Sequence, residues 1–242
     1  MKVLVINGSP RKTKNTASVL KSMCKGAASK GAATEYVHLY GLKYTGCISC
    51  FKCKVAGDKN YARCALRDGL TPVLQSAREA DVVILGSPIY FYCETGMMRA
   101  FMERFMFQYE IYTNKSPKFS PHKKATALVY TMNWKETDIE AIGGNHPIAA
   151  SKMFMEWIFG RCELFICSQT KQVDDYSKYE MDRCDSIAID KRHADFFPQE
   201  LQRAFDFGVK LVSENESISP IDEVFRAPVD LPRFFNFAPV KN

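Results

Sequence analysis

The chain has 242 residues, of which 46% are hydrophobic, so it is long enough and apolar enough to bury a sizeable core. The formal net charge of +6 is modest, and the basic residues form no block interleaved with aromatic side chains, which argues against a nucleic-acid partner. No stretch approaches the roughly 18 continuous apolar residues that a membrane helix needs, so we expect no membrane association.

The N-terminus and the cysteine count indicate the cellular compartment in which the protein works. The sequence enters a β-branched run at once, without the apolar region or the cleavage site of a secretion signal. Nine cysteines without such a signal are more often metal ligands or redox groups than disulfides. We therefore expect a cytoplasmic protein.

Strand and helix patterns alternate along the chain. In the first half we expect a strand at 2–7, a helix over 16–27, a strand at 34–39, a helix near 71–79 and a strand at 81–86. In the second half we expect a helix marked by Met97, Phe101 and Phe105, a strand at 125–131, a helix near 148–159 and a strand near 163–168. Residues 107–122 look like an inserted loop, and residues 133–146 form a polar stretch after the strand at 125–131. Pro198 is expected in the first turn of a last helix.

This alternation predicts an α/β fold, a doubly wound five-stranded parallel sheet of order 2-1-3-4-5. In that order ligands bind at the carboxyl ends of the strands, near the point where the strand order reverses. Residues 1–214 would form this domain, with a cysteine-bearing excursion at 41–67. The Pro- and Phe-rich residues 215–242 would form an extended C-terminal arm.

The segment 8–16 (GSPRKTKNT) joins the first strand to the first helix. It matches neither G-x-G-x-x-G nor G-x-x-x-x-G-K-[ST], which argues against a dinucleotide fingerprint and an NTP-hydrolysing loop. Hydroxyl and amide side chains at a helix N-terminus suit a terminal phosphate monoester, whose charge Arg11 and Lys14 can offset. The alternative is an ordinary polar turn with Thr13 or Asn15 as the helix cap.

The third strand runs into a second candidate binding loop, residues 86–96 (GSPIYFYCETG). Pro88 fixes its own backbone angle, and Tyr90 and Phe91 offer flat apolar surface beside backbone amides. A planar, partly polar ring system needs such a surface. The alternative is that these aromatic side chains pack in the core.

Four of the nine cysteines fall between residues 47 and 64. Cys47, Cys50 and Cys53 have x2, x2 spacing, which can point three thiols into one small volume, as an iron–sulfur cluster requires. Residues 54–63 separate Cys53 from Cys64, the expected fourth ligand. Three interpretations stay open: a [4Fe–4S] cluster, a zinc or other structural metal on the same thiols, or reduced thiols without a ligand.

The two loops resemble those of the flavodoxin-like, NADPH-dependent FMN reductase family, over most of residues 1–135. The segment CISCFKC between them is similar to the family's iron–sulfur flavoprotein branch, and TKQVDDYSKYE at 170–180 also resembles members of this group. There are two departures. Lys14 stands where a glycine often precedes the Asn-Thr pair, and the iron–sulfur members keep the fourth cysteine closer behind the third.

The resemblance implies FMN as the cofactor and NAD(P)H as the co-substrate. The FMN phosphate would lie against Ser9, Arg11, Asn15 and Thr16, with Lys14 compensating for the missing glycine. The isoalloxazine would lie along Pro88, Ile89, Tyr90 and Phe91, with Thr131 and Met132 on its far side. No catalytic side chain is predicted, since hydride chemistry belongs to the flavin.

The implied function is an FMN-dependent oxidoreductase that takes hydride from NAD(P)H. Its electrons would pass to a small-molecule or protein acceptor, through a [4Fe–4S] cluster if one is held. The alternatives are a non-enzymatic, flavodoxin-like electron carrier and a flavin-free metal-binding module. The resemblance also implies a homodimer or homotetramer, and we expect the arm and the 41–67 excursion to help build its interface.

Overall fold

The computed structural model describes residues 1–112 and 124–215. Its sheet consists of β1 (Lys2–Asn7), β2 (Ala33–His38), β3 (Val82–Pro88), β4 (Lys124–Thr131) and β5 (Gly160–Cys167). The helices are α1 (Asn15–Ser29), α2 (Leu70–Glu79), α3 (Gly96–Phe107), α4 (Glu136–Ala141), α5 (His146–Phe159) and α6 (Ser186–Asn215). The five strands pair in parallel in the order β2-β1-β3-β4-β5, which confirms the expected fold class and order.

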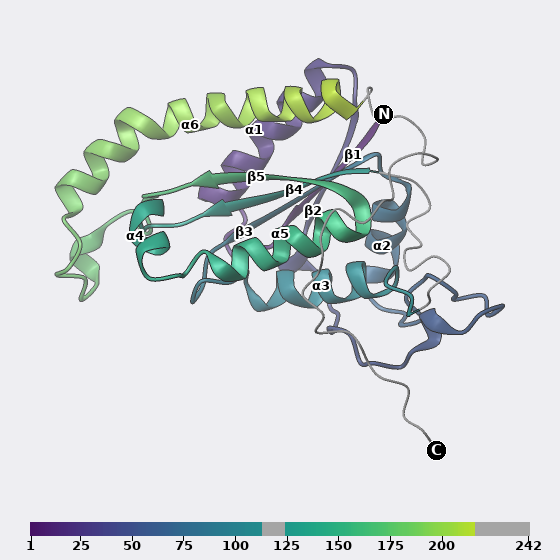
Figure 1. Ribbon diagram of the computed structural model, residues 1–242. Coiled ribbons are helices and arrows are strands. Elements are labelled where there is room, and N and C mark those ends of the chain that lie inside the picture. The colour runs from purple at the N-terminus through teal and green to yellow at the C-terminus, as the bar shows by residue number, and fades with distance from the viewer. Residues whose placement is uncertain (113–123, 216–242) are drawn as a thin grey trace.

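Two helical layers cover the sheet, α1 and α6 on one face and α2, α3 and α5 on the other (Figure 1). Alternate side chains of β1 point to opposite faces of the sheet, and those of residues 3–6 are all apolar, which explains why both faces are covered. Leu4 and Ile6 pack against the second layer, while Val3 and Val5 pack against the first, and each of the four is at most 1% exposed. A strand buried on both faces needs a continuous apolar run, and the sequence supplies one.

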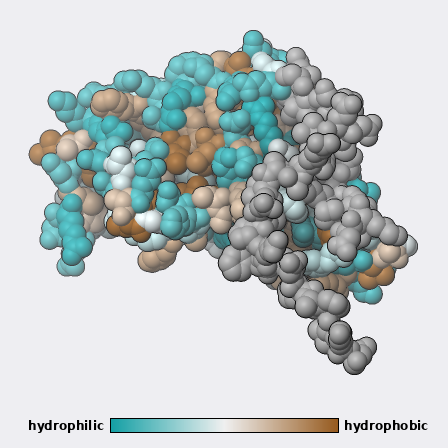
Figure 2. All heavy atoms as spheres, in the orientation of Figure 1, coloured by the Kyte–Doolittle hydropathy of each residue, from teal (hydrophilic) through white to brown (hydrophobic). Residues whose placement is uncertain are grey.

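The edge strand β5 is less completely covered than the central strands. Its Leu164 and Ile166 are only half-buried. Figure 2 shows hydrophobic residues gathered in the middle of the visible face, around β5, with hydrophilic residues over most of the rest. Within the described ranges, no helix is both long and apolar enough to cross a membrane.

The last helix begins earlier than expected, so the placement of Pro198 in a first helical turn is wrong. Helix α6 starts at Ser186 and contains Pro198 in its interior. The N-terminal part is held by other contacts, since Asp190 pairs with Lys171 and the ring of His193 stacks on Phe197. These contacts stabilise the helix before the proline, although the proline itself can donate no backbone hydrogen bond.

Two further segments need comment. The polar stretch 133–146 contains the short helix α4 at residues 136–141, whose Ile139 is buried. Most of the segment 107–122 and all but the first residue of the arm 215–242 lie outside the described residues. Residue 215 itself ends α6, and the division into a domain and an arm stays a prediction.

Candidate functional site

The phosphate-loop candidate is built on hydrogen bonds within its own turn. Asn7 Oδ1 accepts from the amide of Ser9 at 2.9 Å, and Ser9 Oγ accepts from the amide of Arg11 at 3.1 Å. Helix α1 then starts behind Lys14, which caps it in an extended conformation with no side-chain capping hydrogen bond. The assignment of Thr13 or Asn15 as the helix cap is therefore wrong. The first-turn amides of α1 lie at the positive end of the helix, where a phosphate binds well.

The two candidate loops meet at the carboxyl edge of the sheet. The amide of Gly8 donates to Gly86 O at 2.8 Å, and Thr95 Oγ1 donates to Gly8 O at 2.7 Å. A Cβ at Gly8 would lie 2.8 Å from Met98 Cβ, so only glycine allows this approach. The loop after β1 and the loop after β3 thus form one continuous surface.

The ring-loop candidate turns its aromatic side chains outward. Tyr90 and Cys93 exchange backbone hydrogen bonds around a two-residue turn, whose central Phe91 and Tyr92 have φ of 49° and 66°. Such turns usually carry Asn and Gly, so two aromatic residues there are strained. Tyr90 is 47% exposed and Phe91 is 98% exposed, so the alternative of core packing is wrong for both.

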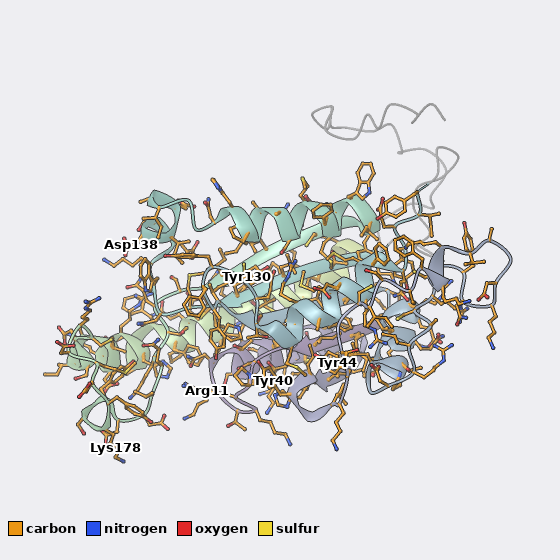
Figure 3. The ribbon with its side chains drawn as sticks, turned by 90° about the horizontal axis from the view of Figure 1, so that it is seen from below. Arg11, Tyr40, Tyr44, Tyr130, Asp138 and Lys178 are labelled. Atoms are coloured by element: carbon orange, nitrogen blue, oxygen red, sulfur yellow. The ribbon has the colours of Figure 1, made fainter. Side chains whose placement is uncertain are left out.

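The residues predicted to bind the flavin differ in how far they are exposed to solvent. Thr16 and Thr131 are buried, and their hydroxyls lie 2.7 Å apart, which ties the start of α1 to the end of β4. The remaining predicted residues divide into buried Ser9 and Met132, half-buried Asn15, Pro88 and Ile89, and exposed Arg11, Lys14, Tyr90 and Phe91. Arg11 lies towards the same end of the molecule as Lys178 (Figure 3).

The segment 171–174, which follows β5, also reaches the phosphate loop. Asn15 Nδ2 donates to Lys171 O at 2.7 Å, Lys14 Nζ contacts both carboxylate oxygens of Asp174 at 2.7 Å, and Arg11 donates to Gln172 O. The hydrogen bond from Lys14 lowers the pKa of Asp174. We predicted no site role for this segment from the sequence. Two features could have indicated one: residues 170–180 resemble members of the family, and they follow the carboxyl end of a strand.

A buried polar pair lies behind the ring loop. The hydroxyl of Tyr130 donates to Glu94 Oε1, and Arg99 Nη1 lies 3.4 Å from Glu94 Oε2. Tyr130 lies in the interior between sheet and helices (Figure 3). Burial, followed by the neighbouring Glu94, raises the pKa of Tyr130. Neither Tyr130 nor Glu94 was predicted as a site residue, because neither belongs to a recognisable sequence motif.

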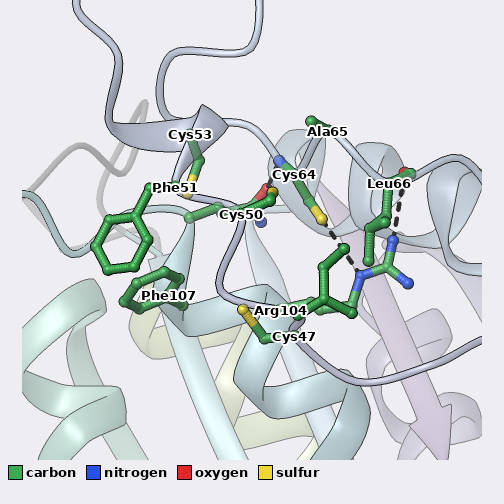
Figure 4. A pocket seen from close by; sticks show the side chains of 11 residues that line it. Cys47, Cys50, Phe51, Cys53, Cys64, Ala65, Leu66, Arg104 and Phe107 are labelled. Carbon is green, nitrogen blue, oxygen red and sulfur yellow. Dashed lines mark hydrogen bonds between the residues drawn. The ribbon is translucent and has the colours of Figure 1, made fainter.

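The second candidate site is a pocket lined by Cys47, Cys50, Cys53 and Cys64 (Figure 4). The ten-residue insertion folds back, because the amide of Ala62 donates to Cys53 O at 3.0 Å. The structure therefore brings all four predicted ligands to one pocket.

Basic and polar side chains lie around the cysteine pocket. The amide of Cys64 donates to Gln108 Oε1 at 3.0 Å. Lys54 Nζ lies 3.9 Å from the centre of the Phe107 ring and donates to Phe107 O. Burial raises the pKa of the Cys53 thiol, and the adjacent Lys54 opposes this shift. The pocket thus combines thiols with positive charge.

The spacing of the thiols bears on the zinc interpretation. Zinc brings every thiolate to about 2.3 Å from one ion, whereas a [4Fe–4S] cluster binds each thiolate through its own iron. Across residues 1–112 and 124–215, no three His, Cys, Asp or Glu residues lie close enough to hold a single metal ion.

Backbone strain is concentrated at the candidate sites. In the described part of the chain, the non-glycine residues with positive φ are Ser49, Phe51, Ala62, Phe91, Tyr92 and Gln169. The first three lie around the cysteines, the next two form the ring loop, and Gln169 stands just before the segment 171–174. Strain of this kind persists where the surrounding structure fixes a functional geometry.

The family model described as NADPH-dependent FMN reductase matches residues 1–138. An iron-sulfur flavoprotein of Methanocaldococcus jannaschii is 35% identical over 104 residues, which is 43% of this chain and 51% of that protein. An iron-sulfur flavoprotein of Archaeoglobus fulgidus is 33% identical over 106 residues, which is 44% of this chain and 46% of that protein. The chain thus spans about half the length of the curated relatives it matches.

Two solved structures share the fold. An NAD(P)H:quinone oxidoreductase from Methanothermobacter marburgensis has a TM-score of 0.58 at 15% identity, covering 87% of this chain and 96% of that one. An azoreductase from Bacillus anthracis has a TM-score of 0.59 at 15% identity, covering 86% and 99%. At these identities the likeness concerns the fold alone. Since the family model covers more than half of the sequence, the chain belongs to the NADPH-dependent FMN reductase family.

Proposed function

We propose that the protein is an FMN-dependent oxidoreductase that takes hydride from NAD(P)H and passes electrons to a small-molecule or protein acceptor. The observation that carries the proposal is the junction of the two loops, where Gly8 bonds to Gly86 and Thr95 bonds to Gly8. A phosphate and a planar ring belong to one molecule only if their binding loops meet. Membership of the NADPH-dependent FMN reductase family supports it.

The residues present fit FMN by their chemistry. The uncapped start of α1, with Ser9, Asn15 and Thr16, would bind the phosphate, and Arg11 and Lys14 would offset its charge. When bound, FMN accepts the hydride that NAD(P)H gives up, and its reduced ring returns the two electrons to an acceptor.

The exposed aromatic residues of the ring loop would shape the flavin site. Pro88, Ile89, Tyr90 and Phe91 would lie along the flavin ring, with Thr131 and Met132 on the far side. Apolar surface there also excludes water from the face at which hydride is transferred.

The cysteine pocket fits a [4Fe–4S] cluster on Cys47, Cys50, Cys53 and Cys64. The support is their convergence in one pocket and the similarity to iron-sulfur flavoproteins. Such a cluster carries one electron at a time, so it would deliver single electrons from a two-electron donor.

An anaerobic absorbance experiment tests the proposal. Purified protein, loaded with FMN where needed, is mixed with NADPH or NADH, and iron and sulfide are assayed in parallel. We expect the flavin bands to bleach. Flavin that stays oxidised would favour the electron-carrier alternative. A chain that takes up no FMN would contradict both and favour a flavin-free metal-binding module.

A further inference from the structure

Arg104 is a buried cation that contacts the sulfur of Cys64. The residue lies near the C-terminal end of α3, and its side chain is 0% exposed. Its Nε donates to Cys64 Sγ at 3.3 Å (Figure 4). The guanidinium thus faces the thiol that the insertion 54–63 returns to the pocket.

The rest of the guanidinium is fixed by further partners. Arg104 Nη1 donates to Asp68 Oδ2 at 2.6 Å and to Thr45 O at 3.1 Å, and Nη2 donates to Leu66 O at 3.4 Å. Burial lowers the pKa of Arg104, but hydrogen bonds to Asp68 and Cys64 outweigh this and hold it above its usual range. A buried charge needs such pairing. These contacts hold the guanidinium in place with its Nε directed at the sulfur of Cys64.

This contact has a chemical consequence for a thiolate ligand. Thiolates gathered in a pocket carry negative charge, which a hydrogen-bonded guanidinium offsets. Hydrogen bonds to the sulfurs and net charge help to set the reduction potential of an iron–sulfur cluster. Reduction adds one electron and no atom, so a fixed cation stabilises the reduced form more than the oxidised form.

We propose that Arg104 is a positioning residue that holds Cys64 as the fourth ligand of a [4Fe–4S] cluster and raises the reduction potential of that cluster. The inference rests on the proposed function, because it requires a cluster on the four cysteines. Asp68 serves a different purpose, since it neutralises Arg104 and anchors the loop by accepting from the amide of Leu70 at 3.0 Å.

The test compares full-length wild type with Arg104→Gln, Arg104→Lys and Asp68→Asn, all purified anaerobically. Iron and sulfide are counted per chain, and the cluster's midpoint potential is titrated with dithionite as the electron donor and followed by electron paramagnetic resonance. For Arg104→Gln we expect the equilibrium to move at least tenfold towards the oxidised cluster, about 59 mV for a one-electron couple. Arg104→Lys keeps the charge without the Nε donor, so its potential should lie between those of Arg104→Gln and wild type.

Asp68→Asn is the matched control, because it breaks the same ion pair from the other side. It removes an anion, so the potential should rise or stay. A purely structural role would move the potentials of Arg104→Gln and Asp68→Asn in the same direction, and that result overturns the inference.

The remaining outcomes are also decisive. If wild type holds a cluster and both Arg104 variants have the wild-type midpoint potential, the inference is wrong and the proposed function still stands. Wild type without iron and sulfide contradicts the inference and the cluster in the proposed function. If Arg104→Gln does not fold or retains no cluster, Arg104→Lys decides: a lowered potential supports the inference and an unchanged one overturns it.

Discussion

At the start of α1, the charges that would meet a phosphate already have partners. Lys14 contacts Asp174, and the two side chains are 45% and 83% exposed. A pair this exposed contributes little to stability, because water screens it. A doubly charged phosphate would therefore compete successfully for Lys14, while the charge of Asp174 would act against the phosphate.

Asp174→Asn should tighten FMN binding roughly two- to fivefold, because the exposed ion pair no longer competes with the phosphate. The dissociation constant is measured by quenching of FMN fluorescence on titration into flavin-free protein. Asp175→Asn is the matched control, since Asp175 bonds within its own turn, to Ser177. Equal affinities for Asp174→Asn and wild type would count against a phosphate beside Lys14.

The residue types of both loops could be predicted from the sequence, but their partners could not. Ser9, Thr16 and Pro88 stand in local patterns that a reader of the sequence can recognise. The contact between Asn15 and Lys171 joins residues 156 positions apart, and no local pattern announces it. The same holds for Cys64, because the ten-residue insertion gives no sign of whether it returns to the other thiols.

Among the elements, α1 and α6 approach each other backbone to backbone. A Cβ at Gly26 would lie 2.0 Å from Phe205 O, and one at Gly208 would lie 2.2 Å from Met23 O. No local pattern in the sequence announces this close approach. The start of α6 could not be predicted, since Pro198 suggests a helix start and the ion pair of Asp190 with Lys171, which ties the first part of the helix to the fold, is tertiary.

Gly26→Ala and Gly208→Ala should each lower the free energy of unfolding by about 2 kcal/mol or more, because backbone atoms cannot yield to the new methyl group. A loss of stability is diagnostic, because without the close approach an alanine would stabilise the helix relative to glycine by about 1 kcal/mol. Chemical denaturation followed by circular dichroism gives the values. Gly41→Ala is the control, because nothing lies within 4 Å of its added Cβ. Stability at or above wild type in either helix variant would refute the close approach.

For the whole molecule, thiols shielded from water make stability depend on pH in the alkaline range. Burial raises the pKa of Cys24 and Cys162 from 9.0 to about 11 and that of Cys167 to about 12. Each thiol stays protonated in the fold while it ionises in the unfolded chain. The stability they contribute is complete below pH 9 and is lost as the pH rises through the folded values. Lys124 acts oppositely above pH 8, because burial lowers its pKa to about 8.

Above pH 9 the free energy of unfolding should fall less steeply with pH in Cys167→Ala than in wild type. The slopes should differ by up to about 1.4 kcal/mol per pH unit. Urea unfolding at a series of pH values between 8 and 11 measures the slope. Val129→Ala, which also removes buried volume but no titratable group, should lower stability equally at every pH. A Cys167→Ala slope as steep as that of wild type would show that this thiol is not the cause.

Helix α3 joins the two candidate centres, with the ring loop at its N-terminus and the cysteine pocket at its C-terminus. Its aligned peptide dipoles place about half a positive charge at the first end and about half a negative charge at the second. If both centres are present, this field favours added electrons on the flavin and disfavours them at the thiols. Lys54, which donates to Phe107 O, and Arg104 weaken the field at the second end. The helix would therefore favour electrons on the flavin, while the two cations at its far end would favour them at the thiols.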